Sequence, residues 1–78
     1  MKIKTEYIEK IVKNSPLVLW ATWADEPIYG SRFTIMVKVP GVVGPKPIYF
    51  IHRNGVDSWE IDEDRPVHRD AIDLLFGE

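Results

Sequence analysis

The dipeptide Asn54-Gly55 restricts the fold of this chain more than any other feature of its sequence. Both residues tolerate positive φ, and apolar residues alternate on either side of them, which is the pattern of a two-residue type I′ hairpin turn. The turn predicts a register in which Phe50 faces Trp59 and His52 faces Asp57 across two antiparallel strands. Residues that face each other share one side of a sheet. One side of this hairpin therefore carries Ile48, Phe50, Trp59 and Ile61, and the other carries Tyr49, Ile51, Ser58 and Glu60.

Two more strands are expected upstream of the hairpin. Residues 32–39 alternate, with Phe33, Ile35, Val37 and Val39 on one face and Arg32, Thr34, Met36 and Lys38 on the other. Residues 17–24 are apolar on both faces, which is typical of a central strand or of one covered on both sides. The face with Leu17 and Leu19 is expected to point to the core, which places Trp20 on the opposite face. Residues 40–47, rich in proline and glycine, are expected to form the loop between antiparallel strands.

A helix is expected at each end of the sheet. Thr5 can cap the first helix, whose apolar stripe is Tyr7, Ile8, Ile11 and Val12 and which ends at residues 14–16. Asp64 can cap the second helix, whose stripe is Val67, Ala71, Leu74 and Leu75 and which Gly77 stops. The prediction is a single α+β domain over residues 1–78. It has a short N-terminal helix, an antiparallel sheet of about four strands and a C-terminal helix, with both helices mainly on the face of Phe33, Phe50 and Trp59.

Length and composition narrow the class of protein. Seventy-eight residues allow one domain with a small core, and the absence of cysteine excludes disulfides and thiolate metal ligands. No apolar run reaches the roughly 20 residues that a membrane span needs, and the N-terminus lacks the apolar segment of a signal peptide. We therefore expect a cytoplasmic protein that does not enter a membrane.

No residue pattern in the chain predicts catalysis, a metal or a cofactor. His52 and Asp57 resemble a general base with its carboxylate, but Ser58 points to the other face of the strand, so a surface polar pair is the favoured interpretation. His68 lies one helical turn after Asp64, yet two ligands do not make a metal site. Gly41 and Gly44 lack the following lysine of a phosphate-binding loop. We therefore expect a protein that is not an enzyme.

Charge divides the chain into two parts. Residues 57–78 hold eight acidic and two basic residues, a net charge of minus six, and residues 1–56 hold eight basic and four acidic residues, a net charge of plus four. A division of this size favours a surface that meets a charged partner or a second copy of the chain. The candidate acidic edge is Asp57, Glu60, Asp62, Glu63 and Asp64. The alternative is that these residues only form a solvated end that complements the positive end of the second helix.

Direct binding of nucleic acid is disfavoured. Lys2, Lys4, Lys10 and Lys13 are the candidate basic patch. Glu6 and Glu9 interrupt it, and the chain as a whole has a net charge of −2. Phosphate contacts dominate the affinity of nucleic-acid-binding proteins, so an acidic chain with an interrupted patch is a poor candidate.

In general character the chain resembles the small inhibitors that phages and mobile elements carry, among them inhibitors of CRISPR nucleases. The resemblance covers no motif and transfers no residue. With the charge division, it favours a non-enzymatic inhibitor or adaptor that binds a larger protein with a basic surface. The acidic edge would meet that partner together with an aromatic sheet face made of Trp20, Met36, Tyr49 and Ile51. The alternative is a homo-oligomer, such as a dimer, that packs these faces together and binds a small ligand between its subunits.

Overall fold

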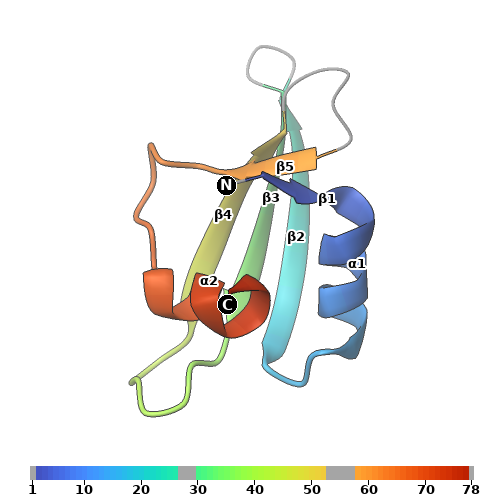
Figure 1. Ribbon diagram of the computed structural model, residues 1–78. Helices are drawn as coiled ribbons and strands as arrows, with labels where there is room; N and C mark the ends of the chain where they lie inside the picture. The colour runs from blue at the N-terminus through green and yellow to red at the C-terminus, as the bar shows by residue number, and fades with distance from the viewer. Residues whose placement is uncertain (1, 27–29, 53–57, 78) are drawn as a thin grey trace.

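The computed structural model describes residues 2–26, 30–52 and 58–77, with side chains described at these positions except 23–26 and 30. These residues form an α+β fold with an antiparallel sheet (Figure 1), which confirms the predicted class. The elements in chain order are β1 (Lys2–Lys4), α1 (Thr5–Asn14), β2 (Val18–Glu26), β3 (Gly30–Val37), β4 (Lys46–His52), β5 (Ser58–Ile61) and α2 (Arg69–Phe76).

The sheet has the strand order β1-β5-β4-β3-β2, and each neighbouring pair is antiparallel. Strand β1 was not predicted from the sequence. It is three residues long and pairs with β5, with Ile3 opposite Trp59. Alternation over three residues is too short to be recognised in a sequence, and a distant part of the chain completes the pairing.

Strand β2 lies at the edge of the sheet, so the prediction of a central or doubly covered strand was wrong. A bulge explains the placement of its first residues: Val18 is opposite Val37, but Trp20 is opposite Met36, which leaves Leu19 as the extra residue. Leu19 is therefore half exposed and does not point to the core as expected. The apolar residues on both faces of β2 do not reflect burial on both faces.

The hairpin of β4 and β5 is present, but its register differs from the prediction. Phe50 is opposite Ile61 and Ile51 is opposite Glu60, a shift of two residues from the pairing that Asn54-Gly55 implies. The turn itself and Asp57 lie outside the described residues. A shift of two residues keeps every side chain on its predicted face because side chains alternate with a period of two. Phe50 and Trp59 are accordingly both buried.

Strand β4 begins at Lys46, earlier than the proline-rich loop predicted, and includes Pro47. Pro47 is opposite Met36 on β3. On the other side of β4, strand β5 ends at Ile61, which is opposite Phe50. Pro47 therefore has no partner residue on β5, and its missing N–H removes no hydrogen bond between β4 and β5. The preceding loop turns at Gly41 and Gly44, whose φ angles are 82° and 76°.

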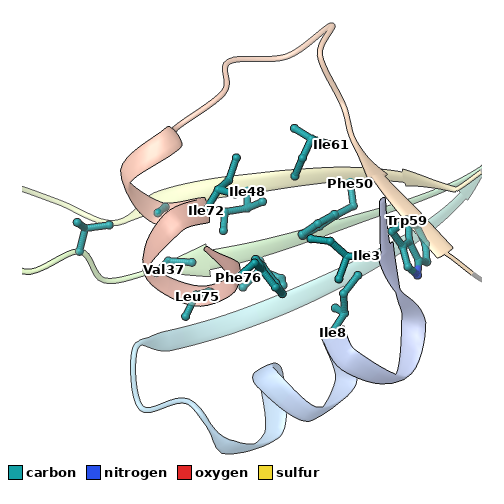
Figure 2. Packing of buried hydrophobic residues seen from close by; sticks show 13 residues of the cluster. Ile3, Ile8, Val37, Ile48, Phe50, Trp59, Ile61, Ile72, Leu75 and Phe76 are labelled. Carbon is teal, nitrogen blue, oxygen red and sulfur yellow. The ribbon is translucent and has the colours of Figure 1, made fainter. Parts of the chain in front are cut away.

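Both helices pack on the same face of the sheet, as predicted (Figure 2). Ile8 of α1 and Phe76 of α2 are buried there against the strands. The ring of Phe76 meets that of Phe50 edge-on, with centroids 5.7 Å apart. The cluster of buried residues comprises Ile3, Ile8, Ile35, Val37, Val39, Ile48, Phe50, Trp59, Ile61, Ala71, Ile72, Leu75 and Phe76.

The helices begin differently from the predictions. Strand β1 runs directly into α1, so Thr5 is the first residue of the helix and Lys4 occupies the N-cap position. Lys4 makes no side-chain capping bond, because its ammonium group has no acceptor. Helix α2 begins at Arg69, so Asp64 does not cap it. Its buried face is Ala71, Ile72, Leu75 and Phe76, while Leu74 is 42% exposed. The predicted end at Gly77 is confirmed, since its N–H donates to the carbonyl oxygen of Asp73.

Candidate interaction surface

One face of the sheet points away from both helices, and we call it the open face. Its residues follow from the register of the strands, because alternate positions on paired strands share a side. The open face carries Lys2 and Lys4 on β1, Ser58 and Glu60 on β5, Pro47, Tyr49 and Ile51 on β4, Arg32, Thr34 and Met36 on β3, and Trp20 and Thr22 on β2. No helix of the described residues packs on this side, as Figure 1 shows.

The four residues of the predicted aromatic sheet face all lie on the open face. Trp20 is opposite Met36 across β2 and β3, while Tyr49 and Ile51 are alternate residues of β4. The side chain of Trp20 is 48% exposed, and the other three are partly exposed. A half-exposed indole beside a methionine is the kind of residue that supplies binding energy in protein interfaces.

The structure separates the residues of the predicted acidic edge. Asp57 lies outside the described residues. Glu60 is on the open face, where its Oε1 atom is 4.0 Å from Nζ of Lys2. Both of these side chains are well exposed, so the ion pair contributes little to stability. Glu63 and Asp64 are exposed in the turn that follows β5.

Asp62 is a structural residue, and the expectation that it is solvated was wrong, since it is only 4% exposed. Its N–H donates to the carbonyl oxygen of Tyr49 at 2.9 Å, which extends the β4–β5 pairing by one residue. Its Oδ1 atom accepts the N–H of Asp64 at 3.2 Å, and its Oδ2 atom lies 3.6 Å from Nε of Arg65. Aspartate commonly stabilises turns by accepting an N–H two residues further along.

Arg65 connects this turn to the open face. Its guanidinium carbon lies 5.0 Å from the centre of the Tyr49 ring, which is a cation–π contact. The turn that carries Glu63 and Asp64 therefore borders the open face beside Tyr49. Sequence analysis did not identify Arg65. The only available signal was an arginine three residues after an aspartate in a short, charged segment.

The charges around the open face are mixed. Lys2, Lys4 and Arg32 place positive charge on the sheet itself, and Glu60 offsets part of it. Beside the sheet, the turn after β5 carries the exposed Glu63 and Asp64. The acidic edge predicted from the sequence is therefore a short acidic rim at one end of the face.

The candidate chemical residues are not assembled into a site by the described part of the chain. His52 packs its ring on Trp59, with the ring centroids 4.9 Å apart. His68 is the residue before α2, and Asp64 belongs to the turn after β5. Among residues 2–26, 30–52 and 58–77, no group of three or more His, Cys, Asp or Glu side chains is arranged to hold a metal ion.

Comparison of the chain with protein families, curated proteins and solved structures gives no match. Within the described residues, neither helix has the length and apolar character needed to cross a membrane.

Proposed function

We propose that this chain is a non-enzymatic protein-interaction module, an inhibitor or adaptor that binds a larger protein through its open face. The observation that carries the proposal is a sheet covered by helices on one side only, with Trp20 half exposed on the other. The proposed setting is the cytoplasm, where inhibitors of the kind carried by phages and mobile elements act on larger host or phage proteins.

The proposed partner has an apolar pocket or patch beside a basic surface region. Trp20, Met36 and Ile51 would be buried against the apolar part, since aromatic residues supply most of the energy of such interfaces. Glu63 and Asp64 would face the basic part. Charges at the rim of an interface mainly raise the rate of association and orient the encounter.

The Trp20→Ala variant is expected to lose partner binding while its fold is retained. Truncation of a tryptophan that is buried in an interface costs about 2 kcal/mol or more when it is a hot spot, which weakens binding by about 30-fold or more. The measurement is a capture of proteins from host lysate by the immobilised chain, followed by titration of each captured protein after purification.

The control for this variant is Val43→Ala, because Val43 is 95% exposed and lies in the loop before β4, outside the strands that form the open face. The two variants should melt like the natural chain, but only Trp20→Ala should lose the captured protein. Equal capture by both variants would show that Trp20 does not contact the partner.

Reversal of the acidic rim tests the charge of the partner. Replacing Glu63 and Asp64 with lysine changes the net charge by four, from −2 to +2. The association rate with the purified partner is expected to fall about tenfold or more at low salt, and the difference is expected to shrink as salt is raised, because screening removes steering. Stopped-flow or surface-plasmon-resonance measurements would give these rates.

A matched control is the reversal of Asp70 and Asp73, which are exposed on α2, on the helix-covered side of the sheet. That variant has the same net charge of +2 but leaves the rim intact. Equal association rates for the two double variants would assign any effect to net charge and remove the acidic rim from the proposed interface.

A further inference from the structure

A hollow of about 280 Å³ lies between the loop that precedes β4 and the beginning of α2, and we call it the α2 hollow. Figure 1 shows the beginning of α2 beside the first half of β4, where these segments meet. Lys46, at the start of β4, lines the hollow and is opposite Val37, which belongs to the buried cluster. The hollow is therefore on the helix-covered side of the sheet, away from the open face.

Three valines form the apolar part of the α2 hollow. Val39 is buried in the core, Val67 packs against the core, and Val42 is 38% exposed in the loop before β4. Pockets for drug-sized ligands enclose about 300–1,000 Å³ and combine an apolar lining with a few polar groups. The α2 hollow is slightly smaller than this range, so it suits a small organic molecule.

Basic side chains line the remainder of the α2 hollow. Lys46 comes from β4, while His68 and Arg69 come from the beginning of α2. Within the described part of the chain, none of these three residues forms an ion pair with a carboxylate. Asp70 also lines the hollow and is exposed. One lysine and one arginine against one aspartate leave a net charge of plus one with His68 neutral. Like charges gathered in this way repel one another, and an anion placed between them removes the repulsion.

We propose that the α2 hollow binds a small organic phosphate, a phosphate monoester with a short apolar group. Lys46 and Arg69 would bind the phosphate oxygens through charge-assisted hydrogen bonds, and His68 would donate a further hydrogen bond. The apolar group would lie on the three valines. A phosphate dianion matches the two full positive charges better than a carboxylate does. This site is separate from the open face, so Trp20→Ala should leave it intact.

Titration of the natural chain with phenyl phosphate, followed by its backbone amide resonances in NMR spectra, tests the proposal. Saturable shifts are expected at the amides of Val42, Lys46 and Arg69. Inorganic phosphate lacks the apolar group and benzoate lacks the second charge, so each is expected to bind about fivefold more weakly or worse. Absence of saturable shifts at millimolar phenyl phosphate, or equal binding of benzoate, would contradict the proposal. A phosphotyrosine peptide carries the same group on a protein, and tighter binding of this peptide than of phenyl phosphate would contradict a small-molecule ligand.

Charge variants locate the site. Arg69→Gln and Lys46→Gln are each expected to weaken the binding of phenyl phosphate about fivefold or more. Lys13→Gln is the matched control, because Lys13 is exposed in the last turn of α1, outside the lining of the hollow, and its loss changes the net charge equally. Asp70→Asn is expected to tighten binding about twofold or more, a gain that a damaged fold cannot produce. Equal weakening by Lys13→Gln, or an unchanged affinity of Asp70→Asn, would overturn the proposal.

Discussion

The Trp59→Ala variant is expected to lose about 3–5 kcal/mol of its free energy of unfolding, the range for truncating a buried tryptophan. Trp59 is 2% exposed and packs on two rings, those of Phe33 at 5.8 Å and His52 at 4.9 Å between centroids. It is also opposite Ile3, so its loss would loosen the contact between β1 and β5. A small domain has only about 5–15 kcal/mol of net stability. Urea denaturation followed by circular dichroism measures the change.

Val43→Ala is again the appropriate control. Its free energy of unfolding should stay within about 0.5 kcal/mol of that of the natural chain, because surface substitutions rarely have larger effects. A Trp59→Ala chain with an unchanged midpoint would mean that the core of the sheet does not depend on this residue. The packing described for β1, β3 and β5 would then be incorrect.

Replacing Asp62 with alanine is expected to cost about 1–3 kcal/mol, since the Asp64 N–H loses its acceptor and Arg65 loses its carboxylate. Arg65 should then also leave the Tyr49 ring, which would increase the exposure of Tyr49. Denaturation measures the first effect. Protection of the Tyr49 ring protons from a soluble paramagnetic agent, followed by NMR, measures the second.

Asp62→Asn separates the two roles of this carboxylate. The asparagine oxygen can still accept the N–H of Asp64, while the ion pair with the partly exposed Arg65 is lost. We expect the asparagine variant to lose less than about 1 kcal/mol. Equal losses for alanine and asparagine would show that the turn depends on the charge of Asp62 and not on its hydrogen bond.

The sequence predicted which face of the sheet each side chain occupies better than it predicted which residues pair across the strands. Alternation assigned Phe50, Trp59, Tyr49 and Ile51 to their faces correctly because a strand has a fixed period of two. The same residues did not determine the register, which depends on how many residues the connection uses. The first strand and the late beginning of α2 could not be predicted either, because tertiary contacts decide them.

In the candidate interaction surface, too, the face of each strand residue was predictable from the sequence, but the contacts of the turn were not. Trp20 and Met36 were placed on the open face by periodicity alone, and the register confirms that they are opposite each other. The burial of Asp62 could not be predicted, since it depends on a turn that directs one carboxylate inward and on Arg65 lying over Tyr49. A count of charges along a sequence does not distinguish an exposed carboxylate from one that is buried and hydrogen-bonded within a turn.

The pairing of β1 with β5 has a consequence for how the chain reaches its native state. Lys2 is opposite Glu60, so the two strands are far apart in the sequence, whereas the other strand pairs join neighbours in the chain. Contacts of large sequence separation form late because closing a long loop costs entropy before the contact gains anything. During synthesis, the pairing of residues 2–4 with β5 has to wait until residues 58–60 leave the ribosome. The β2–β3–β4 meander can form earlier, and the addition of β1 to β5 is then the step that completes the sheet.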